Sequence, residues 1–87
     1  MAKIEIEVTN HAGLHTRPGN DFVKLAKEFE SKIEVENEKG LKVKGTSLLK
    51  ILSLGIKKGS KVTIHAAGED EALAVEKLGE FLINLAE

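Results

Sequence analysis

The chain has 87 residues, and its 13 basic and 14 acidic side chains give a formal net charge of −1. This length predicts one domain, residues 1–87, with a single small core. The near-neutral charge does not indicate binding to nucleic acid or to a membrane. The absence of cysteine excludes disulfides and thiolate metal sites. The alternating N-terminus is expected to be neither a signal peptide nor a membrane span, and we expect a cytoplasmic protein.

Two changes in the spacing of apolar residues organise the first half of the chain. Residues 3–9 alternate apolar and polar side chains, which predicts a strand buried on one face. From about Thr16 the spacing becomes helical, with one apolar stripe: Phe22, Leu25, Ala26 and Phe29. Residues 32–36 and 41–44 alternate again, and residues 37–40 between them predict a hairpin turn. The outward Glu and Lys rows of these two strands are placed to pair.

The second half predicts a short helix, a strand and a last helix. Ser47 precedes an apolar run and is a natural N-cap for a short helix that Gly55 ends. Gly59 returns the chain to a strand over 62–66, and the acidic stretch 68–70 opens a last helix. The buried stripe of that helix is expected to be Ala74, Val75, Leu78, Leu82 and Leu85. The predicted order is βαββαβα, and strands with one apolar face require a helix layer, giving a two-layer α+β sandwich.

The stretch Gly13-Leu14-His15-Thr16-Arg17-Pro18 contains the only arginine and the only proline. A neutral imidazole such as that of His15 is a good nucleophile near pH 7. Arg17 offers a planar fork of donors that suits phosphate. Pro18 is favoured in a helix's first turn, whose unpaired N–H groups attract anions. An ordinary solvated histidine at a capped helix start is the alternative, but the combination favours a phosphoryl-carrying site.

Phosphoryl transfer requires mainly positioning and charge stabilisation. We expect a ring nitrogen of His15 to attack phosphorus, Arg17 to stabilise the phosphoryl oxygens and Thr16 to help order the turn. The sequence has no Walker loop and no acidic pair with Mg²⁺ spacing near His15, so no cofactor is expected. The phosphoryl group should therefore come from another phosphoprotein. The chain is better described as a carrier than as an enzyme acting on a small molecule.

The segment HAGLHTRPGNDF resembles the active-site signature of the HPr family, the histidine-containing phosphocarriers of the bacterial phosphoenolpyruvate:sugar phosphotransferase system. The segments TSLLKILSLGI and AAGEDEALAVEKL resemble the family's second and third helices, so the resemblance spans the chain. It implies that enzyme I phosphorylates His15 at Nδ1, that sugar-specific enzyme IIA domains remove the phosphoryl group, and that Arg17 matches the conserved partner. It also implies an open-faced sandwich, with three helices on one side of a four-stranded antiparallel sheet.

Two short stretches depart from the family pattern: residues 19–21 and the residues that flank Ser47. The run Gly19-Asn20-Asp21 replaces the usual two small residues, and glycine weakens a helix by up to ~1 kcal/mol relative to alanine. We expect this run to alter partner preference or transfer rate. Ser47 aligns with the serine that an HPr kinase phosphorylates in many members, but Thr46 and Lys50 differ from the usual flanks. Helix capping explains Ser47 fully, and regulation is the less favoured interpretation.

The adjacent residues Leu48 and Leu49 cannot both be buried on one helix stripe, and we expect Leu49 to be exposed. A docking surface of apolar and basic side chains around His15 would suit acidic faces of enzyme I and enzyme IIA, by the same resemblance. Its expected members are Thr16, Phe22, Lys24, Lys27, Leu48, Leu49, Lys50 and Leu54. A carrier that serves several partners in turn is expected to be a monomer.

Other readings remain open or are disfavoured. A regulatory relative, serving a nitrogen-related phosphorelay or binding transcriptional regulators, is the main alternative. A nucleic-acid-binding α+β domain is disfavoured, because the outward strand faces carry glutamates and no aromatic platform. His11 and His15 are four residues apart, but no thiol or carboxylate completes a metal site. His65 should face outward from its strand as solvated surface.

Overall fold

The structure is a computed structural model that describes residues 1–9, 13–14 and 16–84. The predictions for His11, His15 and Leu85 therefore lie outside the described residues. The observed order is βαββαβα, as predicted. The elements are β1 (Ala2–Glu7), α1 (Thr16–Ala26), β2 (Lys32–Glu36), β3 (Lys42–Lys44), α2 (Leu48–Ser53), β4 (Lys61–Ala67) and α3 (Glu71–Ile83).

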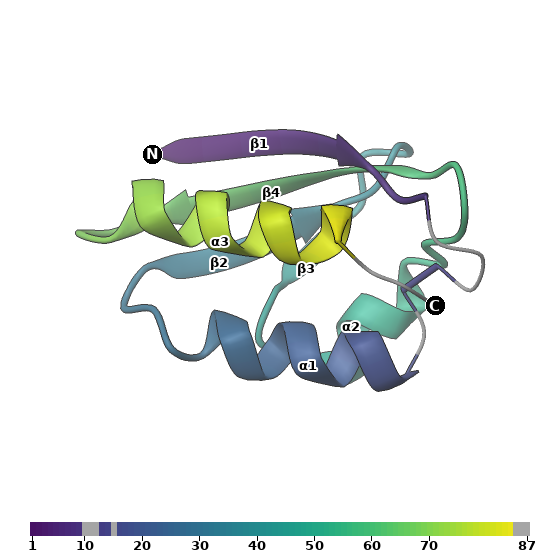
Figure 1. The fold of residues 1–87 in the computed structure, drawn as a ribbon, viewed down its shortest axis with the longest axis horizontal. Coiled ribbons are helices and arrows are strands. Elements are labelled where there is room, and N and C mark those ends of the chain that lie inside the picture. The colour runs from purple at the N-terminus through teal and green to yellow at the C-terminus, as the bar shows by residue number, and fades with distance from the viewer. Residues whose placement is uncertain (10–12, 15, 85–87) are drawn as a thin grey trace.

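The four strands form one antiparallel sheet in the order β1-β4-β2-β3. All three helices lie on one face of this sheet, so the predicted open-faced sandwich is confirmed (Figure 1). The register between β2 and β3 places Glu34 opposite Lys44 and Glu36 opposite Lys42. The two rows of opposite charge therefore face each other on the outer side of the sheet, as the alternation predicted.

The core lies between the sheet and the helices. Buried apolar side chains come from every strand except β3 and from all three helices; the largest that are fully buried are Phe22, Ile51, Ile64, Leu78, Leu82, Val8, Val35 and Val62. Helix α1 ends at Ala26, earlier than the predicted stripe, because Glu28 N–H and Phe29 N–H bond carbonyls three residues back. Phe29 is still partly buried against the core.

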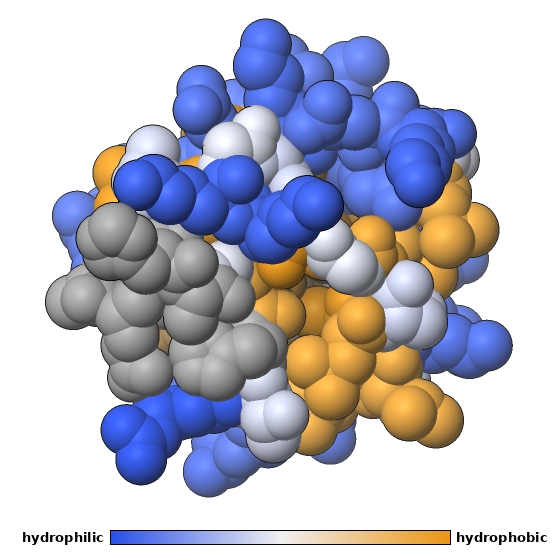
Figure 2. Space-filling view, turned by 90° about the vertical axis from the view of Figure 1, so that its right-hand side faces the viewer, coloured by the Kyte–Doolittle hydropathy of each residue, from blue (hydrophilic) through white to orange (hydrophobic). Residues whose placement is uncertain are grey.

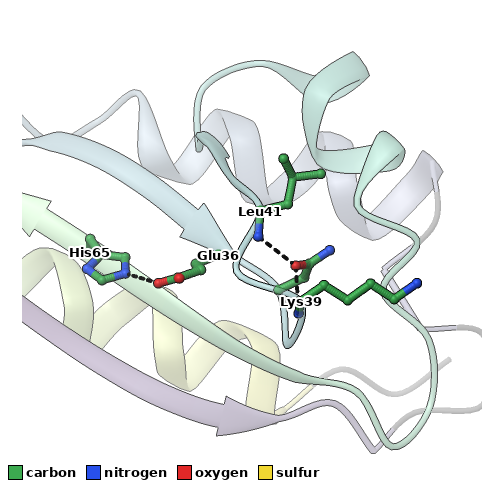
Figure 3. A network of polar contacts seen from close by, with 5 residues as sticks. Glu36, Lys39, Leu41 and His65 are labelled. Carbon is green, nitrogen blue, oxygen red and sulfur yellow. Dashed lines mark hydrogen bonds and ion pairs between the residues drawn. The ribbon is translucent and has the colours of Figure 1, made fainter.

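The turn between β2 and β3 is organised by Asn37. Its side-chain Oδ1 accepts hydrogen bonds from the backbone N–H groups of Lys39 and Leu41, both at 3.0 Å (Figure 3). Its Nδ2 donates to the carbonyl of Leu54 at 3.3 Å, which ties the turn to the end of α2. The predicted hairpin is thereby confirmed, and its turn is anchored to the helix layer.

His65 lies on the outer face of β4, as predicted, but the expectation of a solvated side chain is wrong. Its Nε2 is 2.8 Å from Glu36 Oε1, and its side chain is only 13% exposed (Figure 3). The reason is that β4 is an inner strand, flanked by β1 and β2, so neighbouring side chains cover the ring.

Asp70 ties the start of α3 to the connection between α1 and β2. Its carboxylate accepts hydrogen bonds from Glu30 N–H and Ser31 N–H, both at 2.9 Å, and from the Ser31 hydroxyl. The Ser31 hydroxyl, followed by the backbone donors, lowers the pKa of Asp70 from its ordinary value. We call this set of bonds the Asp70 clamp.

The clamp predicts how stability depends on pH. Because the folded-state pKa is lowered, the ionised carboxylate stabilises the fold above the ordinary aspartate pKa, and this stabilisation is lost as pH falls through the folded-state value. Asp70→Asn should therefore unfold at lower denaturant than wild type at neutral pH, with the difference shrinking toward about pH 2. Urea unfolding across this range, with the exposed Asp21→Asn as charge control, measures it. A constant difference at every pH would contradict the clamp.

Candidate functional site

Helix α1 begins at Thr16, directly after His15 in the sequence. Thr16 and Arg17 are exposed, while Pro18 is buried within the first turn. The predicted helix start is therefore confirmed, although His15 itself lies outside the described residues. The first N–H groups of a helix lack intrahelical acceptors, so this end of α1 offers donors and a partial positive charge to an anion.

The segment that leads into α1 is held against the connection between α2 and β4. Leu14 N–H donates to the carbonyl of Ile56 at 3.1 Å, and the Leu14 side chain is buried. Gly13 has φ +66°, and a Cβ at this position would lie 2.4 Å from Lys57 Cα and 2.6 Å from the Ile56 oxygen. Only glycine fits both the left-handed backbone and this approach. We call this contact the Gly13 anchor.

The other side of the Gly13 anchor is itself tied to β1. Val8 N–H donates to the Ser60 carbonyl at 2.8 Å, and Gly59 N–H donates to the Val8 carbonyl at 2.7 Å. Residues 56–60 therefore hold both the end of β1 and the start of α1. The sequence showed that Gly13 gives the backbone conformational freedom before the helix. It could not show that Gly13 packs against residues 56–57, because no local pattern links these two segments.

Gly19 is the point of close approach between α1 and α2. It is buried, and a Cβ here would lie 3.1 Å from Leu48 Cδ1 and 3.6 Å from Leu52 Cδ2. From the sequence, this departure from the family pattern was expected to weaken the first turn and to alter partner preference or transfer rate. In the structure, its lack of a side chain also admits the leucines of α2, so the two helices pack closely beside each other.

Most side chains of the predicted docking surface are accessible, while docking itself stays a prediction. Thr16, Lys24, Lys27 and Lys50 are exposed, and Leu48 is half-buried. Leu49 is 79% exposed, as predicted. Figure 2, which looks at the end of the molecule where α1 begins and α2 lies, shows an apolar area on this face. Helices α1 and α2, which carry most of these residues, contact each other.

Two members of the predicted surface lie in the core instead. Phe22 has no exposed area, and its ring packs against Phe81 with centroids 6.2 Å apart. Leu54, the C-cap of α2, is only 7% exposed. Both predictions are wrong for the same reason: these side chains belong to the stripes that their elements direct toward the sheet, so they cannot contact a partner.

Ser47 is the N-cap of α2. It has an extended backbone, and its Oγ accepts a hydrogen bond from Lys50 N–H at 3.4 Å. The capping role is thereby confirmed, while its phosphorylation stays a prediction. Over residues 1–9, 13–14 and 16–84, no three His, Cys, Asp or Glu side chains are grouped to hold a metal ion. No helix in the same ranges is long and apolar enough to cross a membrane.

Comparisons with known proteins agree in one assignment. A family model for the phosphorylation site of the HPr component of the phosphotransferase system matches residues 2–84. The phosphocarrier protein HPr of Borreliella burgdorferi is 40% identical over 87 residues, 100% of both chains. The multiphosphoryl transfer protein of Salmonella typhimurium is 41% identical over 78 residues, 87% of this chain and 21% of that protein. A crystal structure of HPr from Thermoanaerobacter tengcongensis has a TM-score of 0.89 at 38% identity, covering 95% of this chain and 92% of that one.

The Gly13 anchor predicts an unusually costly glycine substitution. Gly13→Ala should lower the free energy of unfolding by more than the ~1–3 kcal/mol of a strained backbone alone, because its methyl group would also displace Lys57. Gly55→Ala is the matched control, since Gly55 has the same φ of +66° with nothing within 4 Å of its Cβ position. Urea unfolding of both variants compares them. Equal losses would contradict the anchor.

The revised surface predicts opposite outcomes for two apolar residues. Phe22→Ala should lower the free energy of unfolding by about 3–5 kcal/mol, as expected for a core aromatic. Leu49→Ala should change it by less than ~0.5 kcal/mol, because the side chain is already in solvent, yet it should weaken binding to protein partners. Thermal unfolding and partner titrations measure both. A strongly destabilised Leu49→Ala would show that Leu49 is not a surface residue.

Proposed function

The chain belongs to the HPr family of phosphocarriers of the phosphotransferase system, and from this premise we propose that His15 is the residue that carries the phosphoryl group. In this proposal, Nδ1 of His15 attacks the phosphorus atom held by enzyme I. The bond from phosphorus to enzyme I breaks as the new N–P bond forms. An enzyme IIA domain then takes the same group from His15 by the reverse sequence of bond changes.

The observation that carries this proposal is the start of α1 at Thr16. A phosphoryl group on the preceding residue would lie next to the N–H groups of the first turn, which have no acceptor within the helix, and to the positive end of the helix. Arg17, exposed in the same turn, would add a charge-assisted hydrogen bond to the phosphoryl oxygens. These groups stabilise charge equally well while the phosphoryl group arrives and while it leaves.

The exposed surface of the helix layer is suited to bind both the protein that donates the phosphoryl group and the protein that accepts it. Lys24, Lys27 and Lys50 are exposed, and α2, which contacts α1, carries the exposed Leu49 and the half-buried Leu48; such a mixture of basic and apolar side chains suits acidic partner surfaces. Enzyme I and enzyme IIA domains are the proposed partners, and the carrier would meet each of them in turn as a monomer in the cytoplasm. A kinase acting on Ser47, or a transcriptional regulator, remains a prediction from the resemblance.

Transfer from enzyme I tests the proposal directly. Incubation with phosphoenolpyruvate and enzyme I should add one acid-labile phosphoryl group, measured by intact mass before and after acid. His15→Ala should abolish this mass change. Arg17→Ala should slow phosphorylation on the order of 10²-fold, the effect of removing one preorganised donor from a reacting site. Arg17→Lys keeps the charge but loses the planar fork of donors, so its phosphorylation rate should lie between those of wild type and Arg17→Ala.

His65→Gln is the matched control for His15→Ala, because it removes a histidine from the outer face of β4. It should leave the phosphorylated fraction unchanged. Retention of the phosphoryl group in His15→Ala would overturn the assignment of the carrying residue. Phosphorylation without onward transfer to any enzyme IIA domain would instead favour a regulatory member of the family.

A further inference from the structure

The sheet ends in two edge strands, β1 and β3, each bonded to a strand on one side only within the residues that the structure describes. Hydrogen bonds of β3 to β2 use the Leu41 carbonyl and the Gly45 N–H. Because antiparallel bonding alternates along a strand, Lys42 and Lys44 direct their backbone groups away from the sheet. Val8 N–H bonds to the Ser60 carbonyl across β4, so Glu5 and Glu7 of β1 direct theirs outward in the same way.

The two edges carry complementary side chains. The outer-face residues of β3 are Lys42 and Lys44, and those of β1 include Glu5 and Glu7; all four are exposed. The helix-facing residue between each pair is apolar, Val43 in β3 and Ile6 in β1. Each edge therefore offers outward backbone groups, exposed charges on the outer face and an apolar side chain on the helix face; β1 also carries Lys3 in the outer row, which lies opposite no charge of β3 in the register below.

The sequence of β1 also repeats that of the strand with which β3 already pairs. β2 reads Lys-Ile-Glu-Val-Glu over residues 32–36, and β1 reads Lys-Ile-Glu-Ile-Glu over residues 3–7. Within one chain, Lys44 faces Glu34 and Lys42 faces Glu36. A second strand of the β2 type on the free side of β3 would give each lysine a glutamate on both sides.

We propose that the β1 edge of one copy of this chain pairs antiparallel with the β3 edge of a second copy. The register that matches the outward backbone groups places Glu5 opposite Lys44 and Glu7 opposite Lys42, with Ile6 opposite Val43. Directly opposed residues of an antiparallel pair point to the same face, so each glutamate meets a lysine on the outer face. This association goes beyond the phosphocarrier function and does not depend on it.

Charge disfavours a contact between two β3 edges, because it would bring lysines against lysines. Two β1 edges can set Lys3 against Glu5, but that contact closes as a dimer and leaves Glu7 without a lysine opposite it. The β1–β3 pairing gives both Glu5 and Glu7 a lysine and extends beyond two copies. Lysines on an edge strand protect it from pairing with its own kind, but they attract an edge that carries glutamates. A groove of about 670 Å³ between Val43 and Lys50 leaves the helix side of the β3 edge open to the incoming copy.

The geometry of the contact fixes the form of the assembly. The two edges lie on opposite sides of a four-stranded sheet, so one copy uses its β1 edge toward one neighbour and its β3 edge toward another. Such a head-to-tail contact leaves one free edge at each end of a dimer, so further copies add and the assembly extends into chains unless its rotation closes a ring. With β3 only three residues long, the contact is small, and small interfaces are weak. The chains form at high protein concentration and at low salt.

Sedimentation equilibrium of the wild-type chain tests the proposal, from micromolar to millimolar concentration, at about 10 mM and about 1 M ionic strength. At low salt the weight-average mass should rise with concentration and pass that of a dimer; at high salt the rise should be lost. Glu5→Lys/Glu7→Lys should abolish it at low salt. Glu76→Lys/Glu80→Lys is the matched control, with the same change of net charge on exposed residues of α3, and it should retain the rise.

Three outcomes would overturn the proposal: a monomer at every concentration, a mass that levels off at the dimer, or association that persists in Glu5→Lys/Glu7→Lys. Far-UV circular dichroism establishes that each variant is folded. If the β1 variant does not fold, Lys42→Gln/Lys44→Gln decides by the same criteria. Amide hydrogen exchange adds a readout by residue: at high concentration the outward N–H groups of Lys42 and Lys44 should become protected, while that of Val43 should stay unchanged.

Discussion

The position of the functional helix depends on one contact between two stretches of backbone. Gly13 lies so close to residues 56–57 that no side chain fits between them, and the next residue bonds to the same segment. Since that segment also bonds to the end of β1, the strand, the connection and the start of α1 are fixed relative to one another. The start of α1 is therefore fixed by a framework that three separate parts of the chain build together.

The fold could be predicted almost completely, because the apolar period changes cleanly at each element. The α1 start followed from Pro18, and the α2 start followed from Ser47, each through a known preference at helix ends. The errors have a common physical cause. Phe22 and Leu54 were placed on the docking surface by resemblance, although Phe22 also belongs to the apolar stripe of its helix. His65 was placed by alternation alone, whereas burial depends on which strands and helices lie beside each residue. Likewise, no local pattern could show that Gly13 meets residues 56–57 or that Asp70 reaches residues 30–31.

The charges are distributed by role. Lys24, Lys27 and Lys50 are exposed on the helix side, where protein partners are expected, whereas the outer face of the sheet carries pairs of glutamates on β1 and β2 and a pair of lysines on β3. These pairs oppose each other inside one chain between β2 and β3, and the pairs at the two edges make the sheet complementary to itself. A net charge of −1 thus conceals two separate electrostatic patterns, one directed at partners and one along the sheet.

The Asp70 clamp and the functional end of the protein lie at opposite ends of α1. The clamp holds Glu30 and Ser31, beyond the last residue of the helix. The 11 residues of α1 span about 16 Å at 1.5 Å per residue. Surface charges are screened over about 8 Å at physiological ionic strength. The negative charge that a carrier gains and loses in every cycle is therefore screened from the Asp70 carboxylate, so phosphorylation should leave the Asp70 clamp unchanged.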